Sequence, residues 1–315
     1  MRRLSVMRFV RMSESWAFVA LMAVAMVSCV QIRSAHAQSP IGIDGHIWLD
    51  ANGEPLPSQD HATIQEMMRS ANVVSWESVG RGVAGVEKLV LEHEGIQFHA
   101  AFRSVDVSVR VPPASGVRKT TMKYRDAAIF ESAAYVMSEL LGIGRVPPVV
   151  ERSVDGQSGT VQIWMEETLP EVDLIQQKML RPPDGVRWRQ QKQIMYVFDN
   201  LIANSDRNQG NLLIDHNWNI WFIDHTRAFK RSSKLLNREG ITACDRQLWR
   251  SLREIDDETI RHHLEPFLES QEITRLISRR RKLIQHIQKL IDKHGEEAVI
   301  FDLRPPGTEM ADWSN

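Results

Sequence analysis

Cysteine is scarce in this sequence, which has only two cysteines, Cys29 and Cys244, among 315 residues. A structural zinc site usually needs about four Cys or His ligands at close spacing, and the sequence has no such cluster of cysteines. If the chain is cleaved after Ala37, Cys244 remains alone and no intramolecular disulfide can form. The sequence therefore excludes a fold held by a cysteine-bound zinc ion.

An excess of positive charge is also lacking, because the formal net charge is −1. A nucleic-acid-binding protein usually carries a basic face and a raised pI, so we expect no nucleic-acid partner. Internal repeats and long low-complexity segments are absent as well. The remaining composition, 43% hydrophobic and 25% charged residues, is ordinary for a globular protein with a sizeable core.

Long hydrophobic runs are missing except near the N-terminus, where residues 16–30 are apolar and follow an arginine-rich start. This run is short for a membrane span, which needs about 20 residues. The small-x-small sequence at residues 35–37 follows it, and together these features predict a secretory signal peptide, residues 1–37. An uncleaved N-terminal anchor, or a lipoprotein signal ending at Cys29, is the alternative. We expect an exported protein, periplasmic or secreted, with no membrane span after cleavage.

The order of the predicted elements is strand-rich first and helical later. Helices are expected at residues 59–72, with Asp60 as its cap, 126–141, 187–204 and, in a long final helix, up to Gly295. Strands are expected at residues 73–79, 82–90, 96–109, 149–152, 160–166, 212–214 and 220–223. This order predicts two lobes of unequal character and does not fit alternating βαβ units.

The most informative segment contains Asp206, Asn211 and Asp224, with a short predicted hairpin between the last two. Phosphoryl transfer needs a carboxylate aimed at the attacking hydroxyl and oxygen ligands for the metal ions that bridge the phosphates. In kinases an Asp is followed five positions later by an Asn, and a second Asp follows a hairpin. The alternative is a polar turn, since turns favour Asp and Asn.

Two stretches carry a family resemblance: FDNLIANSDR at residues 198–207, with Gly210 and Asn211, and IDHTRAF at residues 223–229. They resemble the atypical kinase superfamily, which includes the secretory-pathway kinases of the Golgi casein kinase type, the HipA-like kinases and the phosphatidylinositol 3- and 4-kinases. The resemblance runs from about residue 74 to about residue 295. It implies an α+β, two-lobed protein-kinase-like fold with a strand-rich N-lobe, containing one helix, and a helical C-lobe.

The resemblance also implies roles and cofactors. Asp206 is expected to be the catalytic carboxylate, and Asn211 and Asp224 the ligands of Mg²⁺ or Mn²⁺. Arg207 is expected to brace the loop, and ATP to be the phosphate donor. The expected divisions are a linker and helix at 38–72, an N-lobe at 73–166, a C-lobe at 167–303 and a tail at 304–315.

A glycine-rich stretch, with Gly80, Gly82 and Gly85, precedes a predicted strand. Glycine lets backbone amides approach phosphates, so we expect this stretch to cover the ATP phosphates. A Rossmann dehydrogenase would need a helix after these glycines, which makes it the weaker hypothesis. An ordinary glycine-rich turn is the third possibility.

A kinase then needs a cation on the next long strand, paired with a Glu on the following helix. Arg103 stands where the family usually has Lys, and Glu131 is the expected partner, in preference to Glu139. Lys88 or Lys123 could supply the ammonium instead, and a purely structural pair of Arg103 and Glu131 is also possible.

Met165 lies in the segment expected to contact adenine through its backbone. An ordinary amphipathic strand end would have the same sequence pattern, and it is the alternative. The basic run at residues 279–282 is interpreted as the solvated face of the last helix, with a phosphate- or lipid-binding patch as the alternative. The sequence thus predicts an ATP-dependent kinase acting on a hydroxyl acceptor (protein Ser/Thr first, sugar or lipid next). The alternative is a nucleotide-binding pseudokinase.

Overall fold

The computed structural model describes residues 45–79, 85–111 and 122–306. These all belong to the second of two units into which the chain divides, residues 40–315. Its first part contains α2 (His61–Ser70), β1 (Asn72–Val79), β2 (Val86–His93), β3 (Ile96–Arg103), β4 (Asp106–Val111), β5 (Met122–Ala127), α3 (Ile129–Leu140), β6 (Val149–Val154) and β7 (Gln157–Ile163).

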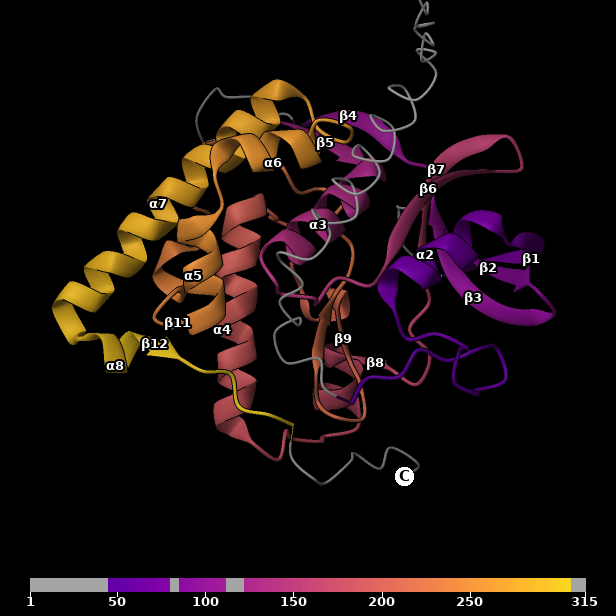
Figure 1. The fold of residues 1–315 in the computed structure, drawn as a ribbon, viewed down its shortest axis with the longest axis horizontal. Helices are drawn as coiled ribbons and strands as arrows, with labels where there is room; N and C mark the ends of the chain where they lie inside the picture. The colour runs from indigo at the N-terminus through magenta and orange to yellow at the C-terminus, as the bar shows by residue number, and fades with distance from the viewer. Residues whose placement is uncertain (1–44, 80–84, 112–121, 307–315) are drawn as a thin grey trace, which may run out of the picture. The chain divides into compact units, whose positions relative to one another are not determined.

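The later part is mainly helical (Figure 1). It contains β8 (Leu169–Pro170), a π-helical turn (Asp173–Gln177), α4 (Gly185–Ile202), short 3₁₀ turns (Gln209–Asn211 and Arg238–Gly240), β9 (Leu212–Ile214), β10 (Ile220–Phe222), β11 (Cys244–Asp245), α5 (Arg246–Glu254), α6 (Asp257–Leu264), α7 (Ser270–His294), α8 (Glu296–Val299) and β12 (Ile300–Phe301). None of the helices in the described ranges is long and apolar enough to cross a membrane.

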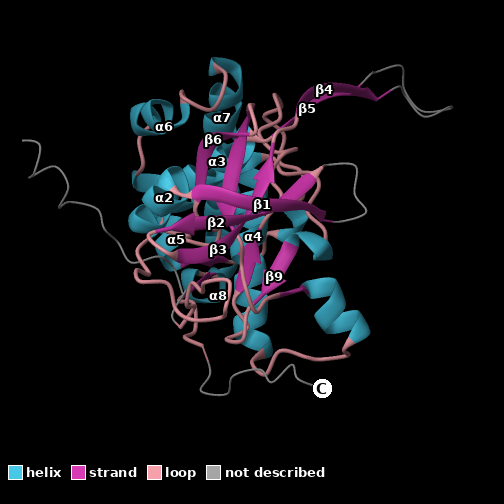
Figure 2. Cartoon of the chain, turned by 90° about the vertical axis from the view of Figure 1, so that its right-hand side faces the viewer, coloured by secondary structure: helices cyan, strands magenta, loops and turns pink. Residues whose placement is uncertain are grey.

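A five-stranded antiparallel sheet in the order β1-β2-β3-β7-β6 organises the first part. Figure 2 shows this sheet with the β4–β5 hairpin extending away from it. Helix α2 begins where Asp60 accepts a hydrogen bond from the Thr63 amide, as the sequence predicts. Its buried Ile64 and Met68 join the apolar residues of β2, β3 and β7 in one core.

A second, larger core is built around α4 and α7 and also includes the buried face of α3. Helix α3 is shorter than predicted, because residues 126–127 end strand β5 instead. A small sheet in the order β10-β9-β8 lies beside α4 and carries the segments of interest at its ends. The predicted α+β fold, with a strand-rich part followed by a helical part, is confirmed.

The basic run at residues 279–282 corrects one expectation. Arg279 is fully buried and donates to the carbonyl oxygens of Leu201 and Lys230, at 2.7 and 2.9 Å. Arg280 is also buried and bonds Asp257 at 2.7 Å. Only the second half of the run is solvent-exposed. A guanidinium can enter a protein interior where backbone carbonyls accept its hydrogen bonds. Arg279 is buried because its position on α7 faces such carbonyls, although its charge alone would favour the surface.

Candidate functional site

The loop that carries Asp206 starts at the C-terminal end of α4. Ala203 caps the helix in the left-handed conformation, at φ +53°, and turns the chain away from the helix axis. The Asn204 amide then donates to the carbonyl of Asp199, and the Asp206 amide donates to the side chain of Asn204 at 3.1 Å. These bonds fix the backbone of Asp206 while its side chain stays 44% exposed, and so open to a second molecule.

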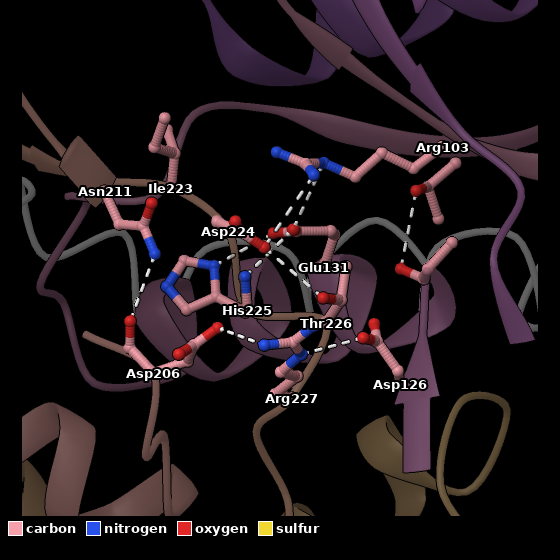
Figure 3. A network of polar contacts seen from close by, with 12 residues as sticks. Arg103, Asp126, Glu131, Asp206, Asn211, Ile223, Asp224, His225, Thr226 and Arg227 are labelled. Carbon is pink, nitrogen blue, oxygen red and sulfur yellow. Dashed lines mark hydrogen bonds and ion pairs between the residues drawn. The ribbon is translucent and has the colours of Figure 1, made fainter. Parts of the chain in front are cut away.

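Arg207 ties this loop to the strand that precedes Asp224. Its guanidinium donates to the carbonyls of Asn211 and Ile223, at 2.7 and 2.8 Å, and pairs with the buried Asp199. The Ile223 amide also donates to the Asn211 carbonyl, at 3.2 Å. Asn211 and Asp224 therefore come from adjacent strand ends (Figure 3). The hydrogen bonds of Arg207 brace the loop between them.

Asp224 adopts a left-handed backbone, at φ +61°, which non-glycine residues rarely adopt. Such a conformation costs on the order of 1–3 kcal/mol and persists only where the surroundings impose it. The Asp224 carboxylate is a quarter exposed and lies 3.3 Å from the hydroxyl of Thr226. The left-handed turn therefore leaves this carboxylate partly exposed two residues after the buried strand β10, where it can bind a cation.

Glu131 of α3 is buried and links the two parts of the fold. It accepts hydrogen bonds from the backbone amide and from Nδ1 of His225, both at 2.9 Å, and lies 3.6 Å from Nε of Arg103. Nη1 of Arg103 lies 3.7 Å from the Asp224 carboxylate. Burial alone would raise the pKa of Glu131, but the bonds from His225 and the positive charge of Arg103 outweigh it and hold that pKa below its usual value.

Arg227 connects Asp206 with a carboxylate that the sequence did not single out. Its Nη1 lies 3.0 Å from Asp206, and its Nε lies 2.8 Å from the buried Asp126 at the end of β5 (Figure 3). The only sequence signal was the arginine within the stretch IDHTRAF, since Asp126 lies 101 positions away from it. The arrangement gives the Asp206 carboxylate a charged hydrogen-bond donor that is itself anchored to a buried carboxylate.

The predicted phosphate cover lies between β1 and β2. Gly85 is exposed with φ +35°, and Gly80 and Gly82 lie outside the described residues. A strand, β2, follows the glycines, so the helix that a Rossmann fold needs is missing there and the dehydrogenase hypothesis is wrong. Nζ of Lys88 lies 4.8 Å from the centre of the Trp164 ring.

Three further residues were considered in the sequence analysis: Met165 as the adenine contact, Lys123 as the cation and Glu139 as its partner. Met165 is buried just after β7, and the preceding Trp164 amide donates to the His99 carbonyl at 3.0 Å. The side chain of Lys123 lies outside the described residues, and Glu139 lies 3.8 Å from His61, away from Arg103.

The oxygens of Asp224 and Asn211 are a hard donor set of the kind that Mg²⁺ and Mn²⁺ prefer. Within the described ranges, no group of three or more His, Cys, Asp or Glu side chains is arranged to hold a metal ion by itself. A site with one carboxylate and one amide fits a metal that takes its other ligands from phosphate and water, as Mg²⁺ commonly does.

Comparison with solved structures shows that the fold of this chain is a known one. Fam20 from hydra, solved with sugar, is 15% identical, with a TM-score of 0.57, and the match covers 79% of this chain and 94% of that one. A Golgi casein kinase is 12% identical, with a TM-score of 0.53 and coverage of 80% and 82%. The Golgi casein kinase with Mn and ADP bound is 13% identical, with a TM-score of 0.52 and coverage of 98% and 97%. These likenesses confirm the fold predicted from the atypical kinase resemblance. No protein-family model matches the chain, and no curated protein does.

Proposed function

We propose that this chain is an ATP-dependent kinase that transfers the γ-phosphate to a hydroxyl group with Mg²⁺ or Mn²⁺, the acceptor being a protein Ser or Thr before a sugar or a lipid. The observation that carries this proposal is the convergence of Asp206, Asn211 and Asp224 on two braced segments beside the Arg103–Glu131 pair. A similar fold has been solved with Mn and ADP bound, which supports nucleotide binding here.

The proposed roles follow from exposure and contacts. The half-exposed Asp206, held by Arg227, accepts a hydrogen bond from the acceptor hydroxyl and orients it. Asn211 and Asp224 hold the metal ion, which would bridge phosphate oxygens and neutralise their charge. Arg103, which Glu131 keeps in place, contacts the phosphates.

The nucleotide side of the site is proposed from the glycine pattern and from the position of Met165 after β7. The backbone amides near Gly80, Gly82 and Gly85 cover the phosphates, and the backbone of Met165 contacts adenine. The corresponding divisions are an N-lobe at residues 73–166 and a C-lobe at residues 167–303. With a signal peptide at residues 1–37 the kinase would be exported.

A specific contact favours a second candidate, a nucleotide-binding pseudokinase. The side chain of Arg103 is only 9% exposed, and its guanidinium lies within 4 Å of both Glu131 and Asp224. An arginine held against the proposed metal carboxylate competes with the metal for it, and arginine is not a neutral replacement for lysine at a tight site. This candidate predicts ATP binding without turnover.

Thermal unfolding of the purified protein with ATP, GTP or ADP, with and without Mn²⁺, is the first test. A kinase is expected to gain several degrees with ATP and Mn²⁺, because a ligand that binds only the folded state stabilises it. Transfer of labelled phosphate to a protein acceptor is then measured for wild type and for Asp206→Ala and Asp224→Ala. The matched control is Asp292→Ala, at an exposed Asp on α7.

Three outcomes separate the candidates. Loss of transfer in the two site variants and not in Asp292→Ala supports the kinase. Binding of ATP without transfer, together with transfer created by Arg103→Lys, supports the pseudokinase. Transfer that survives both Asp206→Ala and Asp224→Ala would show that the site is assigned wrongly.

A further inference from the structure

A pocket of about 530 Å³ lies between residues 234–239 and one side of α7. Helix α7 contributes Lys282, His286 and Lys289, which are spaced four and then three residues apart and so share one face of the helix. The loop contributes Lys234 and Arg238. None of these residues belongs to the site around Asp206, so the pocket is a separate feature of the molecule.

Positive charge dominates this pocket. Four of its side chains, those of Lys234, Arg238, Lys282 and Lys289, are cationic, whereas Glu239 is its one carboxylate. Glu239 pairs with Arg238 at 2.8 Å, and both are exposed, so that pair has little energetic weight. The surplus is therefore three positive charges, in a chain whose formal net charge is −1. Like charges gathered in a concave surface attract an anion that neutralises them.

The backbone of the loop is fixed to α7 at both ends of the pocket. Before it, the buried Arg279 donates to the carbonyls of Lys230 and Ser232. After it, His286 Nε2 lies 3.0 Å from the carbonyl of Ile241. The two walls are thus held together without a ligand, and an anion would enter a largely formed pocket.

Lys282 is the cation whose position is best defined. Its ammonium donates to the carbonyl and the hydroxyl of Ser233, at 2.8 and 3.2 Å. An ammonium has three N–H donors, so a third can donate to a ligand in the pocket. Burial lowers the pKa of Arg279, one turn earlier on α7, to about 9. That value is still above neutral pH, so the guanidinium stays charged and adds to the positive potential of the pocket.

The ligand class follows from the size of the pocket and the type of its cations. Lysines meet phosphate as point charges, and three of them from two walls match several phosphate oxygens better than one planar carboxylate. A single phosphate ion would leave most of the volume unfilled, since pockets of this size hold small organic molecules. We propose that this pocket binds a small molecule that carries two or more phosphate groups.

The test is calorimetric titration of the purified protein with inorganic tripolyphosphate, in metal-free buffer without nucleotide. Wild type is expected to bind it, and Lys282→Gln with Lys289→Gln should weaken binding at least about tenfold, because each lost charged hydrogen bond has an effect of that order. The matched control is Lys293→Gln, an exposed lysine of α7 outside the pocket, which should bind as wild type does. Orthophosphate should bind at least about tenfold more weakly than tripolyphosphate, because it reaches fewer of the cations.

Arg103→Gln separates this pocket from the proposed nucleotide site, because it removes the cation proposed to contact phosphate there, and it should leave tripolyphosphate binding unchanged. The single variant Lys289→Gln, at an exposed position, keeps the test valid if the double variant unfolds at a lower temperature than wild type. The proposal is overturned if wild type does not bind tripolyphosphate, if orthophosphate binds equally well, or if Lys293→Gln weakens binding as much as the pocket variants. Failure of the kinase activity would not affect it.

Discussion

The replacement Arg227→Gln tests whether the bridge between Asp126 and Asp206 positions the carboxylate of Asp206. The side chain of Asp126 is 7% exposed, and its second oxygen has no hydrogen-bond partner among the described residues, so it depends on Arg227 for compensation of its charge. Losing the partner of a buried charge costs on the order of 3–5 kcal/mol. Arg227 is itself 31% exposed, so we expect a loss of unfolding free energy of about 1–3 kcal/mol.

The two ends of the bridge predict different effects. Asp206 is 44% exposed, and its half of the bridge should contribute less than about 1 kcal/mol to stability. Under the proposed function, losing this half of the bridge should slow catalysis, because a carboxylate without its lateral support orients an acceptor hydroxyl poorly. We expect kcat to fall about tenfold to a hundredfold, with KM for ATP nearly unchanged.

Urea unfolding of wild type, Arg227→Gln, Asp126→Asn and the double variant measures the first effect, and steady-state kinetics measures the second. Asp126→Asn should remove most of the stability cost of Arg227→Gln, since no buried charge is left uncompensated. Arg125→Gln is the matched control, because Arg125 pairs with the largely exposed Asp106 away from Asp206. A coupling below about 0.5 kcal/mol between Arg227 and Asp126 would refute the reasoning.

Two further predictions concern stability. Burial alone would raise the pKa of Asp215, but hydrogen bonds from His46, Trp221 and Asn219 outweigh it and leave that pKa lowered. The ionised Asp215 therefore contributes to the unfolding free energy above pH 3.8, and this contribution is lost as the pH falls through the lowered pKa. Asp215→Asn should therefore lower the unfolding free energy by about 1–3 kcal/mol at pH 7, and the difference should shrink below pH 4 in acid-titrated urea unfolding, whereas an unchanged difference would contradict it. Arg279→Met should lower the unfolding free energy by about 2–4 kcal/mol, because it leaves three carbonyls without their charged donor. Residues 230–232 should then become sensitive to limited proteolysis. A loss under about 0.5 kcal/mol would contradict this prediction.

Local spacing predicted the parts of the site that are local in the chain. Asp206 and Asn211 share one loop, and the hairpin that brings Asp224 beside Asn211 is short enough to recognise from its apolar residues and turn. Helix α2 was predictable for the same reason, because its cap and its buried face lie within a few turns. The features that the sequence predicted best are therefore those set by interactions between residues close together in the chain.

Contacts between distant segments were not predictable from these patterns. Asp126 and Arg227 lie 101 positions apart, and nothing in either segment identified the other as a partner. Arg279 was expected at the surface because it belongs to a basic run, yet its place on the inner face of α7 brings it to carbonyls of a separate loop. A charged residue on a helix is solvated only if the opposing element offers it no acceptors, and the sequence of the helix does not contain that information.

Glu131 shows why an arginine at position 103 is compatible with this fold. In the structure, Glu131 is held by two bonds of 2.9 Å from His225, whereas its contact with Arg103 is longer, at 3.6 Å. His225 is in turn held by Arg207, which braces the loop of Asp206. The position of Glu131 therefore depends on the segment that carries Asp224 more than on residue 103. A change of cation at position 103 should then alter contacts with phosphate and with Asp224 while leaving α3 in place, so the choice between kinase and pseudokinase rests on the nucleotide side of that guanidinium.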